Sequence, residues 1–218
     1  MIEIVPAFLV ESNEEFEQKL RLVEGHVNLI QVDALDGSLF PNTVWYDAER
    51  VGALRTKVEM ELHLMVENPI PIVEAWQKHV PTFKRAIVHA EMHRPIGAVV
   101  DHIKNVLKLE CGVALNPETP MKNIEEVLHQ IDSLTIMGVH PGESGQAFLG
   151  DSVIEKIKQV HAHAPDLIIE IDGGVTEELL SSLVSAGITR VCAASLIFKN
   201  EDPEAQIKKL KEELLELN

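Results

Sequence analysis

Three strand-like segments of the sequence carry side chains that can bind a cation or move a proton. Asp33 lies in LIQVDAL, His63 in ELHLMV and Asp172 in IIEIDGG, each within an otherwise apolar segment. Taken singly, a buried histidine is usually a core residue and a strand-end aspartate often caps a turn. Three such residues at equivalent strand ends favour one shared site, because converging carboxylates repel unless a proton or a cation lies between them. We expect these three side chains to hold one divalent ion.

A further polar residue precedes each of the three by two positions. Side chains two positions apart on a strand share one face, so Gln31, Glu61 and Glu170 should point the same way as the three candidate ligands. The amide oxygen of Gln31 is then a possible fourth ligand. Glu61 and Glu170 would lie one layer deeper, where they either orient the ligands or form salt bridges with Arg or Lys inside a barrel. The sequence leaves both interpretations open.

The elements that position these residues alternate regularly between short apolar segments and amphipathic helical ones. The predicted strands are 2–5, 29–33, 58–66, 86–89, 111–115, 133–139, 167–172 and 190–194. The first predicted helix begins after Ser12, which forms a capping box with Glu15. Six further helices are predicted: over about 47–54, from Pro69, over 95–107, from after Pro120 to about 130, up to about 161, and over 176–185. A last helix is capped by Asp202.

Eight strand–helix units in a chain of 218 residues predict a single (β/α)8 barrel that forms one domain, 1–218. A doubly wound open sheet is the competing fold, but that fold usually has a Gly-rich turn after the first strand. The residues here are Pro6-Ala7-Phe8-Leu9-Val10, which contain no glycine. The barrel is therefore the favoured architecture.

Small residues follow the last three predicted strands, in GVHPGESGQAF, DGGV and CAAS. Small residues let backbone amides approach an anion, and the loops after the seventh and eighth strands of a barrel commonly bind phosphate. The predicted phosphate-binding residues are Gly142, Glu143, Ser144, Gly145, Gly173, Gly174, Ala194 and Ser195.

Composition limits the partners that the chain can have. A formal net charge of −16 argues against nucleic acid, although one small phosphate group can still bind to backbone amides. No segment reaches the roughly 18 apolar residues of a membrane span, and the N-terminus does not resemble a signal peptide. Cys111 and Cys192 lie in apolar segments and should be reduced core residues. We expect a cytoplasmic protein that forms a homo-oligomer and binds a small molecule.

Several segments together resemble the ribulose-phosphate 3-epimerase family, from Pro6 to Phe198. The matching segments are VDALDGSLFPN, HLMVENP, VHAE, NPETP, MGVHPGESGQAF, IDGGV and ASLIF. The resemblance implies a (β/α)8 barrel that inverts carbon 3 of a ketopentose 5-phosphate and converts D-ribulose 5-phosphate to D-xylulose 5-phosphate. It also implies one bound divalent ion, which could be Zn²⁺, Mn²⁺, Fe²⁺, Co²⁺ or Mg²⁺.

The resemblance assigns roles to individual residues. It implies that Asp33 is the general base and Asp172 the general acid for one direction, with the roles exchanged in reverse. Met65 and Met137 match methionines that flank the intermediate, although ordinary core packing explains each alone. His63 would bind both the ion and the substrate, and Val10 occupies a position that contacts substrate.

The chain departs from the family pattern at several of these positions. Gln31 replaces a ligand histidine, Val10 and Ala7 replace serines, Leu35 a methionine and Ser38 a histidine, and Gly142-Glu143-Ser144-Gly145 replaces a Gly-Phe-Gly-Gly loop. An amide in place of an imidazole should weaken zinc and favour harder ions such as Mn²⁺ or Mg²⁺. Two alternatives stay open: an epimerase of another ketose phosphate, for example a hexulose 6-phosphate, and a paralogue that binds sugar phosphate without turnover.

Two related barrel chemistries fit less well. Phosphate-binding decarboxylases of similar fold carry Asp-x-Lys-x-x-Asp after a strand, and the corresponding DALD contains no lysine. Triosephosphate isomerase-like chemistry needs a lysine after the first strand, and VPAFLVES has none.

Overall fold

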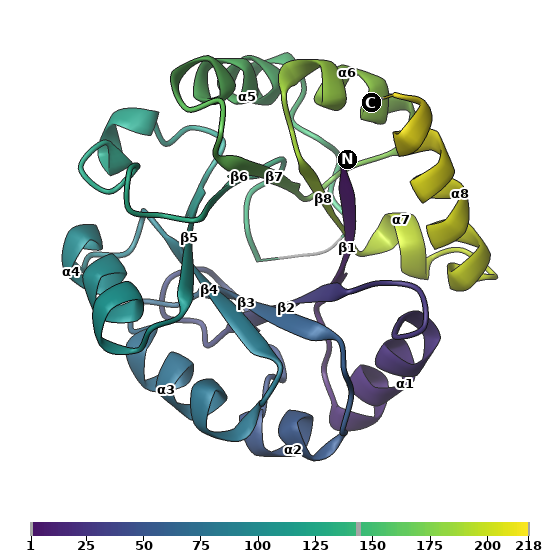
Figure 1. The fold of residues 1–218 in the computed structure, drawn as a ribbon, viewed down its shortest axis with the longest axis horizontal. Helices are drawn as coiled ribbons and strands as arrows, with labels where there is room; N and C mark the ends of the chain where they lie inside the picture. Colours follow the sequence, from purple (N-terminus) through teal and green to yellow (C-terminus); the bar gives the residue numbers. More distant parts are fainter. Residues whose placement is uncertain (1, 143–144, 218) are drawn as a thin grey trace.

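Eight parallel strands close into a barrel in the computed structural model, which describes residues 2–142 and 145–217. The strands follow one another around the barrel in chain order, β1 to β8, and β1 pairs with β8 to complete the ring. Helices form an outer ring around the strands (Figure 1). The predicted single (β/α)8 barrel is confirmed.

The strands are β1 Glu3–Phe8, β2 Leu29–Leu35, β3 Glu59–Met65, β4 Phe83–His89, β5 Glu110–Leu115, β6 Ser133–Met137, β7 Ile168–Asp172 and β8 Arg190–Ala193. The helices are α1 Asn13–Val23, α2 Ala48–Ala53, α3 Ile70–His79, α4 Ile96–Asp101, α5 Asp151–His163, α6 Glu177–Ala186, α7 Ser195–Phe198 and α8 Pro203–Glu216, with a π-helical segment η1 His102–Val106 and a 3-10 segment η2 Met121–Ile124. Within the described residues, no helix combines the length and the apolar character that crossing a membrane requires.

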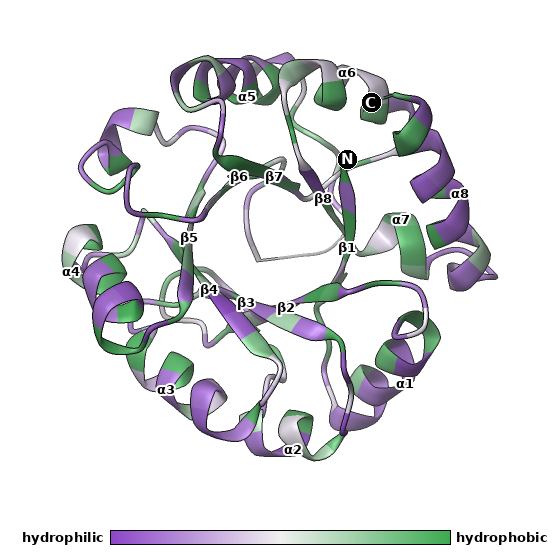
Figure 2. Cartoon of the chain, viewed as in Figure 1, coloured by the Kyte–Doolittle hydropathy of each residue, from purple (hydrophilic) through white to green (hydrophobic). Residues whose placement is uncertain are grey.

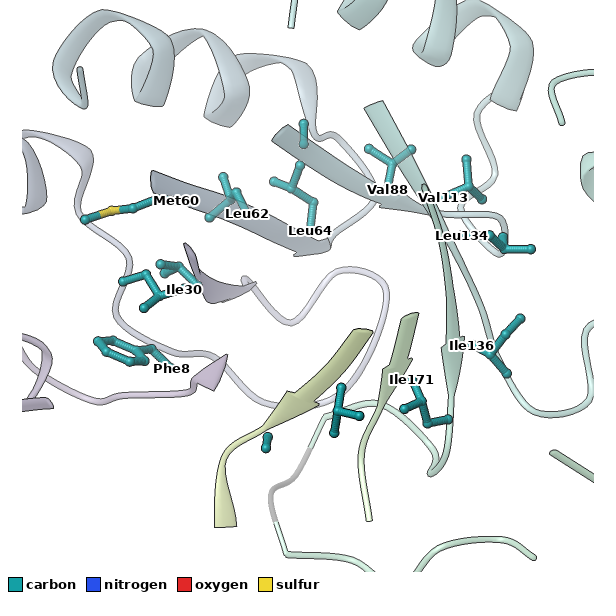
Figure 3. Close-up of a cluster of buried hydrophobic side chains, with 14 of the residues drawn as sticks. Phe8, Ile30, Met60, Leu62, Leu64, Val88, Val113, Leu134, Ile136 and Ile171 are labelled. Carbon is teal, nitrogen blue, oxygen red and sulfur yellow. The ribbon is translucent and has the colours of Figure 1, made fainter. Parts of the chain in front are cut away.

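Most of the hydrophobic core lies between the strands and the surrounding helices. Alternate strand residues such as Ile30, Leu62 and Val88 are fully buried there and point outward from the barrel (Figure 3). The helices present apolar faces to this layer and polar faces to solvent (Figure 2). Because side chains alternate along a strand, the other residues of the same strands must fill the barrel interior.

The barrel interior is mostly polar. Gln31 pairs with Glu61 across β2 and β3, and Asp33 pairs with His63 two residues nearer the C-terminal ends of these strands. A small apolar cluster also lies inside, formed by Val5, Ala7, Leu29 and Cys192. The polar residues that interrupt the apolar strands thus all face one enclosed space.

Two predicted helices differ in the structure. The segment after Pro120 forms the 3-10 segment η2 and then turns, with hydrogen bonds between residues three apart. A three-residue period places Ile124 and Val127 on one face, and this is enough to bury both side chains. The helix predicted over 95–107 changes from α4 to the π-helical η1 at His102. The four-residue helix α7 was not predicted from the sequence.

The capping box at α1 is confirmed only in its first half. The hydroxyl of Ser12 accepts a hydrogen bond from the backbone N–H of Glu15 at 3.2 Å. The carboxylate of Glu15 accepts from the N–H of Glu11 at 2.9 Å, one residue earlier than a standard box requires.

Candidate active site

Two aspartates that lie far apart in the sequence meet at the C-terminal end of the barrel. Asp33 lies on β2 and Asp172 ends β7, and both side chains are at least 87% buried. The amide nitrogen of Gln31 donates to Asp33 Oδ1 at 2.9 Å and to Asp172 Oδ2 at 2.8 Å. The Nδ1 atom of His63 lies 3.2 Å from each of the same two oxygens. Barrel closure therefore brings the three candidate ligands and Gln31 together.

The donor atoms of Asp33, His63 and Asp172 fit a divalent ion. One carboxylate oxygen or ring nitrogen from each residue lies within 4.8 Å of the others. Ligands about 2.1 Å from a tetrahedral ion are separated from one another by roughly 3.4 Å, close to the observed 3.2 Å. Two oxygen ligands and one nitrogen ligand, open to a cleft on one side, form a candidate metal centre.

The same cluster shifts the protonation of its members. Burial raises the pKa of Asp33, repulsion from Asp172 adds to this, and hydrogen bonds from His63 and Gln31 oppose it. Burial alone would lower the pKa of His63, but hydrogen bonds to Asp172 and Asp33 and their charges raise it to about 10. In the absence of another cation, His63 thus supplies the positive charge between the two acids.

The orientation of Gln31 differs from the sequence-based expectation. Its amide oxygen accepts a hydrogen bond from the thiol of Cys192 at 3.2 Å, on the side away from the acids, and its nitrogen faces them. Gln31 therefore acts as a hydrogen-bond donor to the acids in this arrangement. Its role as a fourth metal ligand stays a prediction and requires the amide to rotate by half a turn. The pKa of Cys192 is raised well above its usual value by burial, which keeps the thiol protonated for this contact.

His63 has a second line of contacts that the sequence analysis missed. Its Nε2 atom lies 2.9 Å from Nε2 of His89 on β4, and Nδ1 of His89 lies 2.9 Å from Oε2 of Glu91. Burial lowers the pKa of His89 to about 4, so this ring stays neutral. Burial would raise the pKa of Glu91, but hydrogen bonds from His89, Thr119 and Asn116 lower it. The motif VHAE could have indicated these residues, since His89 ends a strand as Asp172 does.

Glu61 and Glu170 form ion-pair and hydroxyl contacts below the acids. Glu61 bonds to the guanidinium of Arg85 at 2.6 Å, and Glu170 accepts from the hydroxyl of Thr135 at 2.7 Å. Within the part of the chain that the structure describes, neither glutamate is hydrogen-bonded to Asp33, His63 or Asp172. The salt-bridge interpretation is therefore the one observed for Glu61.

A cleft opens directly above the two acids. Asp33 and Asp172 lie in its wall, and Met65 and Met137 flank them. Six of the predicted phosphate-binding residues line the same cleft, namely Gly142, Gly145, Gly173, Gly174, Ala194 and Ser195. The acids and the small-residue loops thus face one shared space.

Two adjacent glycines let the loop after β6 pack against the end of β7. Gly173 and Gly174 have φ angles of 97° and 71°, in the region that favours glycine. A Cβ atom on Gly174 would lie 2.7 Å from the backbone nitrogen of Phe148, and one on Gly173 would lie 2.4 Å from a methyl group of Val139. Glycine at both positions is required for this wall of the cleft.

Among the described residues, three predicted site residues do not line the cleft: Val10, Gln31 and His63. Val10 is 1% exposed and packs in the outer hydrophobic core, because the residue that faces the cleft on this strand end is its neighbour Leu9. Glu143 and Ser144 lie outside the described residues. The cleft also contains Ala7 and Leu196, which the sequence analysis did not assign to substrate.

Comparisons with known proteins show the family of the chain. The sequence model of the "Ribulose-phosphate 3 epimerase family" matches residues 3–198. The ribulose-phosphate 3-epimerase of Bacillus subtilis is 32% identical over 97% of this chain and 99% of that protein, and that of Aquifex aeolicus is 34% identical over 91% and 90%. A solved structure of 3-hexulose-6-phosphate synthase from Salmonella typhimurium superposes with a TM-score of 0.72 at 12% identity over the whole of both chains, which shows a common fold only. The chain therefore belongs to the ribulose-phosphate 3-epimerase family.

Proposed function

We propose that this chain interconverts D-ribulose 5-phosphate and D-xylulose 5-phosphate by inverting carbon 3. The observation that carries the proposal is the pair of buried carboxylates, Asp33 and Asp172, held in one cleft by a common donor. Inversion requires a proton to leave one face of carbon 3 and another to arrive on the opposite face. Two acids from strands β2 and β7 supply one group for each face.

The proton transfers are assigned to the two aspartates. The proton on carbon 3 is acidified by the neighbouring carbonyl group, so a carboxylate can remove it. Asp33 acts as base and Asp172 as acid in one direction, and the two exchange roles in the other. Met65 and Met137 flank the acids with apolar surface, which keeps water away from the carbon that has lost its proton.

Asp33, His63 and Asp172 would hold the metal ion. When bound, a divalent ion supplies stabilisation for the negative charge that develops on the oxygens of carbons 2 and 3. The ligand set contains only one nitrogen and no thiolate, so we infer a preference for Mn²⁺ or Mg²⁺ over zinc relative to a site with two imidazoles. The glycines of the loops after β6 and β7, with Ala194 and Ser195, are assigned to the phosphate group.

The proposal is tested by following exchange at carbon 3 by NMR. The purified protein is supplied in turn with Zn²⁺, Mn²⁺, Fe²⁺, Co²⁺ and Mg²⁺ and offered D-ribulose 5-phosphate, a hexulose 6-phosphate and unphosphorylated ribulose. We expect turnover of ribulose 5-phosphate with at least one ion. Turnover of the hexulose phosphate alone would show an epimerase of another substrate, and calorimetric binding without turnover would show a paralogue that has lost catalysis; either result overturns the proposal.

The substitution Gln31→His should tighten zinc binding. A second imidazole would replace an amide whose nitrogen now faces the acids, adding a ligand that zinc prefers. We expect the dissociation constant for Zn²⁺, measured by competition with a chelating dye, to fall by at least the roughly 10–100-fold that indirect partners of a ligand contribute. Gln18→His, at an exposed position of α1, is the matched control and should leave it unchanged. Equal zinc affinity in Gln31→His and the unmodified protein would contradict the prediction.

A further inference from the structure

His63, His89 and Glu91 form a continuous buried chain of hydrogen bonds that leads away from the acids. The two ring nitrogens, Nε2 of His63 and Nε2 of His89, are 2.9 Å apart, and Nδ1 of His89 is 2.9 Å from Glu91. Both histidines are fully buried and the Glu91 side chain is 17% exposed. A chain of this kind carries one proton per link, so the donor at one end determines the donor at every other link.

Glu91 determines the direction of this chain. Its Oε1 atom accepts a hydrogen bond from the backbone N–H of Asn116 at 2.8 Å, and its Oε2 atom faces His89. A carboxylate has no proton to donate, so Nδ1 of His89 must carry the proton of that contact. The Nε2 atom of a neutral His89 then has a free lone pair and accepts from Nε2–H of His63. The remaining nitrogen of His63, Nδ1, is the one that faces Asp33 and Asp172.

Packing holds the chain in place on both sides. The rings of His63 and His89 stack with centroids 5.0 Å apart, and the ring of Phe40 lies at 73° to that of His89 with centroids 4.9 Å apart. The ammonium group of Lys156 donates to the carbonyl oxygens of Asn116, Pro117 and Thr119. Lys156 thereby fixes the loop after β5, whose N–H group binds Glu91.

We infer that Glu91, acting through His89, is a positioning residue that protonates His63 on Nε2 and leaves Nδ1 available to bind a metal ion. Glu91 lies two side chains away from the acids and contacts neither them nor the cleft. The inference rests on the proposed metal-dependent function for its consequence in catalysis, but the hydrogen-bond direction is a property of the chain itself. In metal sites, outer partners of ligand histidines generally set the tautomer of the ring.

The isosteric substitution Glu91→Gln should reverse the chain. Its amide oxygen must accept from Asn116 N–H, which leaves the amide NH2 group facing Nδ1 of His89. When His63 gives up one of its two protons, as metal binding requires, His89 would be protonated on Nε2 and would donate to Nε2 of His63. His63 would then keep its proton on Nδ1, where the ion must bind. The conservative substitution His89→Gln preserves the original direction, because its oxygen can accept from His63 and its NH2 group can donate to Glu91.

Two measurements test the inference. The ¹⁵N shifts of the histidine rings, recorded without metal, should place the proton of His89 on Nδ1 in the unmodified protein. Zn²⁺ affinity, measured by dye competition, should fall by about 10–100-fold in Glu91→Gln and by less in His89→Gln. Glu67→Gln is the matched control, because Glu67 contacts Nδ1 of the exposed His93 in the same way at 2.6 Å.

The results separate this inference from the proposed function. A proton on Nε2 of His89 in the unmodified protein would overturn the inference whether or not the protein epimerises a sugar phosphate. Unchanged zinc affinity in Glu91→Gln, or an equal loss in Glu67→Gln, would overturn it as well. A protein that binds no metal and turns over no ketose phosphate would refute the proposed function, and the ¹⁵N shifts would still decide the direction of the chain.

Discussion

Asp33→Asn and Asp172→Asn should each slow epimerisation by about 10²–10⁴-fold, the usual contribution of a positioned acid or base. The amide preserves the shape of the carboxylate and its oxygen can still bind an ion, but it cannot take up or release the proton. Each aspartate faces the other across the donor group of Gln31, so loss of either removes proton transfer on one face only. The rate is measured with both epimers at saturating metal, and the metal content of each variant is determined.

Solvent deuterium gives a sharper readout of the two roles. A variant that retains one carboxylate should exchange the carbon 3 proton of one epimer without inverting it, because the same group removes and returns the proton. Asp33→Asn and Asp172→Asn should therefore exchange opposite epimers. Asp36→Asn, which changes an exposed aspartate just beyond β2, should behave like the unmodified protein. Exchange of the same epimer by both variants would show that the acids do not serve opposite faces.

Arg85→Met should destabilise the fold by about 3–5 kcal/mol, because it removes the nearest cation from the buried carboxylate of Glu61 and leaves only Arg190, at 3.8 Å. The Arg85 side chain is 2% exposed and bonds to the fully buried Glu61 at 2.6 Å and to Glu110 at 2.5 Å. For a chain of this length the change corresponds to a fall in Tm of roughly 6–20 °C. Chemical denaturation with urea measures the free energy of unfolding.

The cause of that loss is tested by removing both charges. Arg85→Met combined with Glu61→Leu should recover much of the stability, since paired buried charges are often replaceable by apolar side chains. Lys84→Met removes the neighbouring, partly exposed ion pair with Glu59 and should change the free energy of unfolding by less than about 1 kcal/mol. A double variant no more stable than Arg85→Met alone would show that the lost Glu61 contact does not explain the effect.

Most of the fold was predictable from local periodicity. Alternation of apolar and polar residues along β2, β3 and β7 placed Gln31 with Asp33, and Glu170 with Asp172, on one face, and the structure confirms that arrangement. Eight alternating units predicted a closed barrel rather than a doubly wound open sheet, because no Gly-rich turn follows the first strand. The segment after Pro120 was mispredicted because a three-residue and a 3.6-residue period bury the same apolar positions over so short a stretch.

The sequence by itself determined which residues face the barrel interior and that two carboxylates and an imidazole gather at its C-terminal end. Only the tertiary structure decided that Gln31 presents its nitrogen to the acids and that Leu9, rather than Val10, lines the cleft. It also decided that His89 and Glu91 extend the contacts of His63. The direction of an amide or an imidazole depends on donors and acceptors far away in the chain, such as Cys192 for Gln31. Cys192 and Gln31 become neighbours only when the barrel closes, and no local pattern of residues encodes their contact.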